Sequence, residues 1–125
     1  MISNNKIFIN FSNHPSANWS KEQINEALKY GEIIDIPFPE VDPKLDTEEI
    51  SQLACEYTKK ILEYKPVAVL CQGEMTLSFK VVEKLKSKGI LVLAACTARE
   101  ASNETLEDGS VLRKNKFKFV RFRSY

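Results

Sequence analysis

Two patterns of apolar residues recur along this chain. Short continuous apolar runs are typical of buried strands, and apolar residues three and four positions apart are typical of amphipathic helices. Four short apolar runs predict strands at residues 6–11, 33–36, 67–71 and 90–96. Apolar residues three and four positions apart predict three helices, which begin at Ser20, at Asp46 or Thr47, and at Met75. Strands that alternate with helices build a parallel sheet through right-handed crossovers. The pattern therefore predicts an α/β fold, a Rossmann-like three-layer sandwich with helices on both faces of a parallel sheet.

The pattern changes near the C-terminus, where a hairpin is expected. Asp108-Gly109 is typical of a tight hairpin turn, with strands at roughly 99–106 and 111–122. In the second of these strands the apolar alternation slips by one residue between Phe119 and Val120. A β-bulge at this point is expected to place four apolar side chains on one face. These are Phe117, Phe119, Val120 and Phe122.

Three of the predicted strands run into polar residues. The three segments are Ser12-Asn13-His14, Gln72-Gly73-Glu74 with Thr76, and Thr97 with Arg99. The carboxyl ends of parallel strands share one edge of a sheet, where the amides of the following helices also point. The sequence therefore predicts one ligand site built from three strand ends.

The residues at the first two strand ends suit a nucleotide. His14 is the only histidine, and its imidazole can carry a proton near neutral pH. The Gln72 amide can both donate and accept, as recognition of a base edge or a ribose requires, and Gly73 permits close approach of a ligand. An ordinary loop at His14 and a capped strand-to-helix turn with a surface Glu74 are the structural alternatives.

The third strand end offers phosphate ligands. Thr97 and Arg99 can bind a phosphate, or Arg99 can pair with Glu100 or Glu104 across the hairpin. Trp19 can stack on an adenine or pack beneath the first helix.

Charge is unevenly distributed along the chain. The net charge is +1, but residues 66–125 hold 11 Lys and Arg against 6 Asp and Glu, a net +5. Much of this excess is Arg113, Lys114, Lys116, Lys118, Arg121 and Arg123. A solvated strand edge protected by lysines explains the run, and so does an anionic ligand or a nucleic acid.

Composition narrows the remaining function classes. At 125 residues we expect a single domain, 1–125. Cys55, Cys71 and Cys96 have no C-x-x-C spacing, which argues against a disulfide framework and a zinc site, so no metal and no cofactor is expected. Residues 1–5 lead directly into a strand, without a signal-peptide core, and no apolar run could span a bilayer. The expected location is the cytoplasm.

Together these segments resemble a family of small stand-alone proteins encoded beside type III CRISPR systems. The matching segments are Asn10-Phe11-Ser12-Asn13-His14 with Gln23, Cys71-Gln72-Gly73-Glu74, Ala95-Cys96-Thr97-Ala98-Arg99-Glu100, and Asp108-Gly109 with the terminal residues 117–125. The chain departs from the family pattern at Asn13, which separates Ser12 from His14, and in a longer loop at 15–19.

The resemblance implies a nucleotide-binding fold like that of CARF domains and a ring nuclease. Such an enzyme binds a cyclic oligoadenylate, here expected to be cyclic tetra-adenylate, and opens it through attack of a ribose 2′-hydroxyl on the adjacent phosphate, which ends a type III antiviral signal. The expected catalytic residues are His14, Arg99 and Glu74. The expected ligand-binding residues are Ser12, Asn13, Gln72, Gly73, Thr76, Thr97, Arg121 and Arg123.

The resemblance also bears on partners. It implies a homodimer with the ring across the two-fold axis, and neither a membrane nor a long nucleic acid as partner. The apolar face of the terminal strand and Tyr125 are the candidate interface. Two alternatives remain open: a module that binds the messenger without cutting it, and an unrelated α/β enzyme on a nucleotide or nucleoside with Glu74 as nucleophile or base.

Overall fold

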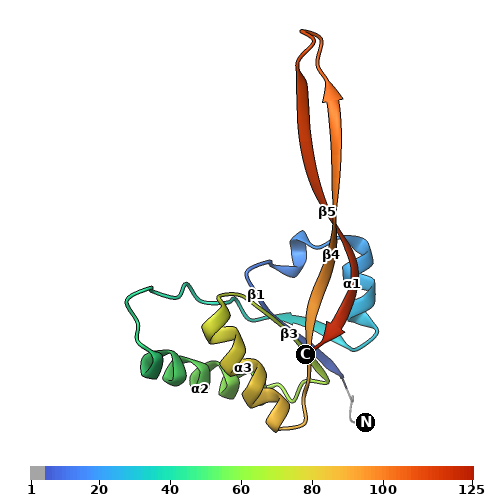
Figure 1. Cartoon of the computed structure of the whole chain (residues 1–125). Helices are drawn as coiled ribbons and strands as arrows, with labels where there is room; N and C mark the ends of the chain where they lie inside the picture. Colours follow the sequence, from blue (N-terminus) through green and yellow to red (C-terminus); the bar gives the residue numbers. More distant parts are fainter. Residues whose placement is uncertain (1–4) are drawn as a thin grey trace.

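The computed structural model describes residues 5–125, which form five strands, three α-helices and one short 3-10 helix (Figure 1). In chain order these are β1 (Ile7–Ser12), η1 (Ser16–Asn18), α1 (Lys21–Leu28), β2 (Glu32–Asp35), α2 (Thr47–Glu63), β3 (Ala68–Gln72), α3 (Met75–Ser87), β4 (Leu91–Thr105) and β5 (Val111–Ser124). Residues 1–4, which entered the expectation about a signal peptide, lie outside the described part of the chain.

The five strands form one sheet in the order β2-β1-β3-β4-β5. The first four are parallel, and β5 pairs with β4 in the antiparallel direction. The mixed α/β fold with a mostly parallel sheet and a C-terminal hairpin is therefore confirmed.

Apolar residues of β1 are buried on both faces of the sheet. Phe8 belongs to a cluster with Ala27 of α1, whereas Ile9 and Phe11 belong to a second cluster with α2 and α3. All three β1 side chains are fully buried. Successive side chains of a strand point to opposite faces, so a continuous apolar run identifies a central strand with helices packed against both faces.

The helices begin where the sequence predicts. The Ser20 hydroxyl accepts a hydrogen bond from the Gln23 amide at the start of α1. Asp46 and Glu49 make both bonds of a capping box at the start of α2. Each bond satisfies a backbone group that has no partner within its own helix.

The structure corrects the prediction of separate elements at 90–96 and 99–106. One strand, β4, runs without interruption from Leu91 to Thr105. Its pairing with β3 ends at Leu93, and β5 pairs with it from Leu93 onward. Because no Gly or Pro interrupts this segment and a new partner strand is in place, β4 continues where β3 stops. Thr97 and Arg99 therefore lie within a strand instead of at a strand end.

The predicted bulge is present in β5. Arg121 pairs with Cys96 and Phe119 pairs with Thr97, so Val120 is the extra residue. The rings of Phe119 and Phe122 lie on one face, with centroids 5.0 Å apart. Val120, the unpaired residue of the bulge, is 57% exposed, and its place on the same face stays a prediction.

Beyond the bulge, β4 and β5 form a long two-stranded ribbon, which we call the arm and define as residues 97–119. Figure 1 shows it in orange and red, extending away from the helices. Every residue from 97 to 118 is exposed. An isolated two-stranded ribbon is marginally stable in water. The arm therefore contributes little apolar burial, and its sequence is free to serve a ligand or partner.

Shortening the arm tests this view of stability. Removing residues 102–114 and joining Ala101 to Asn115 through an Asn-Gly turn should change the free energy of unfolding by less than about 1 kcal/mol, because only exposed residues are lost. Phe119→Ala at the buried base is the control and should cost about 3–5 kcal/mol. Urea denaturation measures both values. A large loss on shortening would show that the arm packs against the body.

Candidate functional site

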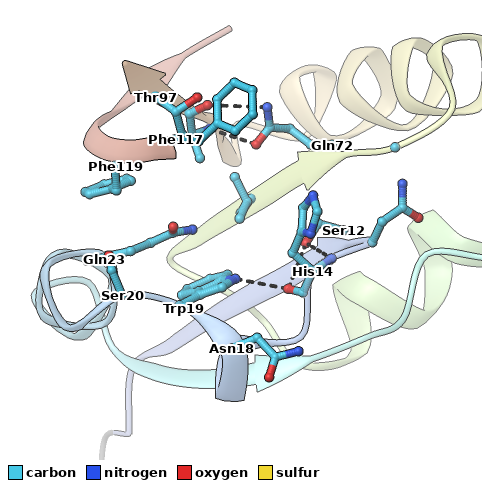
Figure 2. Close-up of a pocket in the computed structure, with 14 residues that line it drawn as sticks. Ser12, His14, Asn18, Trp19, Ser20, Gln23, Gln72, Thr97, Phe117 and Phe119 are labelled. Atoms are coloured by element: carbon cyan, nitrogen blue, oxygen red, sulfur yellow. Dashed lines mark hydrogen bonds between the residues drawn. The ribbon is translucent and has the colours of Figure 1, made fainter. Parts of the chain in front are cut away.

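A pocket of about 470 Å³ opens at the carboxyl ends of β1 and β3 (Figure 2). It lies between the loop that follows β1, the start of α1, and the base of the arm. Its lining residues are Ser12, Asn13, His14, Asn18, Trp19, Ser20, Gln23, Leu70, Gln72, Gly73, Ala95, Thr97, Phe117 and Phe119. Six predicted site residues, from all three polar segments, are thus brought together.

The loop after β1 is fastened through the backbone carbonyl of His14. This oxygen accepts hydrogen bonds from the Asn10 amide at 2.9 Å and the Trp19 indole at 3.0 Å, and the Ser12 hydroxyl oxygen lies 3.2 Å from it. The imidazole of His14 is exposed and lies at the wall of the cavity (Figure 2). The backbone is therefore held from within while the side chain stays available to a ligand.

Asn10 ties this loop to the neighbouring strand. Its side chain is 1% exposed, and its amide also donates to Asp35 Oδ1 at 3.0 Å. The other oxygen of Asp35 accepts from the amide and the hydroxyl of Ser16, both at 3.1 Å. No structural role was predicted for either Asn10 or Asp35. The available signal was a polar residue inside the apolar run Ile7–Phe11, since buried polar groups occur where they have partners.

Ser12 acts within this network. Its hydroxyl donates to Asn10 Oδ1 at 2.6 Å and accepts from the His14 amide at 3.2 Å. The residue is 6% exposed. Its hydrogen-bonding capacity is largely used inside the protein, so it positions the loop.

The Gln72 side chain joins β3 to β4 beyond the end of their ladder. Its Oε1 accepts from the Ala95 amide at 2.9 Å, and its Nε2 donates to the Ala95 carbonyl at 3.5 Å. The amide therefore replaces the backbone of one more residue of β3. This bonded arrangement fixes the floor of the pocket.

Gly73 is required by packing on the side of the sheet that faces α2. A Cβ at this position would lie 2.5 Å from the ring of Phe38. Phe38 in turn packs against Phe11, with centroids 4.6 Å apart. The structure thus gives Gly73 a packing role against an aromatic ring of the same chain, and the close approach of a ligand at Gly73 stays a prediction.

Glu74 caps α3 and is not among the lining residues. Its carboxylate accepts from the Thr76 and Leu77 amides and from the Thr76 hydroxyl. Slight desolvation raises the pKa of Glu74, but the bonds from the Thr76 hydroxyl and these two amides outweigh it and hold the pKa below its usual value. The structure gives Glu74 and Thr76 a capping role, and their ligand roles stay predictions.

The arginines lie outside the lining of the pocket. Arg99 is exposed on the arm, two residues beyond Thr97, and its Nε donates to Asn115 Oδ1 at 3.3 Å. Arg121 and Arg123 pair with Cys96 and Ala94. These positions alternate with Ala95 and Thr97, so the register places both arginines on the opposite face of the sheet from the pocket.

Aromatic rings form part of the wall. Trp19 packs edge-on against Phe8, with centroids 6.3 Å apart and planes at 87°. Trp19 therefore packs on the core beneath the pocket and also lines it, and its stacking on an adenine stays a prediction. Phe117, Phe119 and Gln23 were not predicted as lining residues. The shared face of Phe117 and Phe119 was visible in the alternation, but the position of that face against the loop was not.

The lining contains no Lys, Arg, Asp or Glu among the described residues, and His14 supplies its only imidazole. Amides, hydroxyls and aromatic rings suit an uncharged base or sugar. Burial raises the pKa of the nearby Cys71 thiol to about 12, which keeps it protonated and unreactive.

Two absences within residues 5–125 bear on the site. No group of three or more His, Cys, Asp or Glu is placed to hold a metal ion. No α-helix among them is long and apolar enough to cross a membrane.

Comparison with known proteins identifies the family. A family model described as "Uncharacterized protein MJ1673 family" matches residues 6–123. The chain belongs to this family. No curated protein and no solved structure matches the chain. The matched range includes the whole pocket and the arm.

The Asn10 network generates a stability prediction. Asn10→Ala should lower the free energy of unfolding by about 1–3 kcal/mol, because it leaves buried partners on Ser12 and His14 short of a bond. It should also speed amide hydrogen exchange across residues 13–19. Asn13→Ala is the matched control, exposed in the same loop, and should stay within about 0.5 kcal/mol. Equal effects of the two variants would remove Asn10 as the anchor.

Proposed function

We propose that the pocket binds one adenosine nucleotide of a cyclic oligoadenylate and that the protein opens the ring. One observation carries the proposal. The cavity combines aromatic walls with amide and hydroxyl groups, no fixed charge, and a single imidazole at its edge. Stacking and hydrogen bonds to base edges are how proteins recognise unpaired bases. A volume of about 470 Å³ suits a small-molecule site.

The proposed reaction needs a positioned hydroxyl and a proton carrier. The ribose 2′-oxygen attacks the adjacent phosphorus, a bond forms between them, and the bond from phosphorus to the 5′-oxygen breaks. The products are a 2′,3′-cyclic phosphate and a 5′-hydroxyl. His14 takes the proton from the 2′-hydroxyl, and the imidazolium so formed returns a proton, directly or through water, to the leaving 5′-oxygen. Every atom of the products comes from the ring itself, so the reaction consumes no co-reactant, and in this proposal it uses neither a metal ion nor a covalent intermediate.

The fold supports this placement of the ligand. In open parallel sheets, ligands bind outside the carboxyl ends of the strands, which is where this cavity lies. In this proposal the sheet and its helices are a Rossmann-like, CARF-like variant of that arrangement, and the protein acts in the cytoplasm on a type III defence signal.

The size of the cavity leads to a proposal about oligomeric state. A pocket of about 470 Å³ accommodates a nucleotide more readily than a ring of four. Two copies around a two-fold axis present the same pocket twice to a ring of matching symmetry. Val120 and Tyr125, exposed by 57% and 48%, remain in the proposed interface, although the Tyr125 hydroxyl already donates to the Cys71 carbonyl at 2.7 Å.

A second function, binding without cleavage, is favoured by a specific observation. No cation lines the described pocket, so charge that develops on a phosphate has no partner within it. A third function, nucleotide chemistry with Glu74 as nucleophile or base, is not favoured, because its carboxylate is bonded as the α3 cap.

Cleavage is tested by incubating purified protein with cyclic tetra-adenylate in EDTA and separating the products by chromatography. We expect a linear product with a 2′,3′-cyclic phosphate. His14→Ala should slow cleavage about 10²- to 10⁴-fold while leaving ring affinity nearly unchanged, since general acid–base catalysis contributes this much. Added imidazole should restore part of the rate.

Two results would contradict the enzyme proposal. Stoichiometric binding by wild-type protein with no linear product over hours would leave the non-catalytic function. Full activity of the folded His14→Ala variant would remove His14 as the proton carrier.

The dimer is tested by calorimetry and light scattering. Titration should give one ring for every two chains, and light scattering at micromolar concentration should give twice the 14.3 kDa chain mass. One ring per chain, with a monomeric mass, would refute the shared ring.

A further inference from the structure

The register of the hairpin sorts the arm into two faces of different character. Residues directly opposite each other in an antiparallel pair share a face, and successive residues alternate. One face contains Thr97 and Phe119 and therefore continues directly from the pocket. We call it the pocket face of the arm. Its residues are Thr97, Arg99, Ala101, Asn103, Thr105, Val111, Arg113, Asn115, Phe117 and Phe119.

The pocket face contains two arginines and no Asp or Glu. The opposite face of the arm has both signs of charge: Lys116 pairs with Glu100, and Lys114 Nζ lies 2.7 Å from Glu104 Oε2. Paired charges of both signs are typical of a strand surface that faces only solvent. An acid-free face with an exposed aromatic ring is instead typical of a surface that recognises an anion.

Phe117 stands where the pocket meets the arm. It lines the cavity, where Figure 2 labels it, yet 67% of the residue is exposed. A phenyl ring with this exposure gains little free energy from burial against the core. It offers a stacking platform for a base that lies just outside the pocket.

Arg99 is the cross-strand partner of Phe117. It lies about 7 Å along β4 from Thr97, a residue of the pocket wall. Its Nε donates to Asn115 Oδ1 at 3.3 Å, which leaves the two terminal nitrogens of the guanidinium for another acceptor. A guanidinium with this remaining fork suits the two free oxygens of a phosphodiester.

We propose that the pocket face of the arm is a second subsite, which binds the nucleotide next to the one in the pocket. Phe117 stacks on its base, and Arg99 holds the phosphodiester that joins the two nucleotides. The ligand class is an adenylate chain with at least one phosphodiester, in cyclic or linear form. This inference rests on the proposed function of the pocket, and it supplies the cation that the pocket lacks.

Arg99→Gln and Lys118→Gln are a matched pair for the test. Each removes one positive charge from an exposed position of the arm, but the two residues lie on opposite faces. The probe is cyclic tetra-adenylate with 2′-fluoro sugars, which lacks the attacking hydroxyl. By calorimetry, Arg99→Gln should weaken binding about 10- to 150-fold, as loss of a charge-assisted hydrogen bond does. Lys118→Gln should change it less than about threefold.

Phe117→Ala tests the stacking platform separately. It should weaken binding of the same ring about 5- to 150-fold, the range for loss of one base stack.

Free adenosine fits the pocket alone, so its affinity should change less than about threefold in Arg99→Gln. Circular dichroism should show all three variants folded, because each position is exposed on the arm.

The outcomes separate this inference from the proposed function. If wild-type protein binds neither adenosine nor the ring, the proposed function fails. If the ring binds and Arg99→Gln loses no more affinity than Lys118→Gln, the subsite is overturned and the pocket stands. Linear tetra-adenylate identifies the source of the ligand. If Arg99→Gln weakens the binding of linear and cyclic tetra-adenylate equally, the subsite recognises any adenylate chain. If it weakens the binding of the ring alone, the subsite recognises the cyclic form.

Discussion

The hydrogen bonds between the Gln72 side chain and the backbone of Ala95 fix the direction in which β4 leaves the sheet. The β3–β4 ladder ends at Leu93, yet β4 continues for another twelve residues to Thr105. At this point β4 still needs a partner on its β3 side, and the Gln72 amide supplies both a donor and an acceptor. The arm, the pocket wall at Thr97 and Phe117, and the position of Arg99 all depend on this direction.

The opposite wall of the pocket is fixed by a second side-chain amide, on the neighbouring strand. Ser12 pairs directly with Gln72 in the β1–β3 ladder, and Asn10 precedes it by two residues. Asn10 holds the His14 carbonyl, as Gln72 holds Ala95. Because side-chain amides bonded within the protein fix both the floor and the loop wall, the cavity is formed before a ligand arrives, which lowers the entropic cost of binding. It also leaves the interior uncharged, so phosphate recognition belongs at the rim.

The local features of the fold were predictable from the sequence. Hydrophobic periodicity locates the starts of the strands and helices to within one or two residues, although not the end of β4, and a one-residue slip in the alternation locates the bulge at Val120. The arrangement of three polar segments along one edge also follows from the parallel order of strands. These features depend on neighbours in sequence or on a general rule of topology.

The features that were missed depend on contacts between distant segments. Nothing near residue 97 shows that β5 would extend β4 into an arm. The sequence also does not show which face of β5 would line the pocket, so Arg121 and Arg123, which the predicted bulge places on the face opposite Phe119, were expected in the site. The sequence before Glu74, a strand followed by a glycine, is the same whether Glu74 caps a helix or binds a ligand, so it does not distinguish the two roles. The bond of Asn10 to Asp35 spans 25 residues.

Trp19 provides the most direct test, because it is the only tryptophan in the chain and it lines the pocket. Its fluorescence should be recorded during titration with 2′-fluoro cyclic tetra-adenylate, with binding followed in parallel by calorimetry. The account predicts a saturable change in Trp19 emission with the same midpoint as the calorimetric curve, and competition by free adenosine. Binding of the ring by calorimetry without any change in Trp19 emission would place the ligand elsewhere and contradict the account.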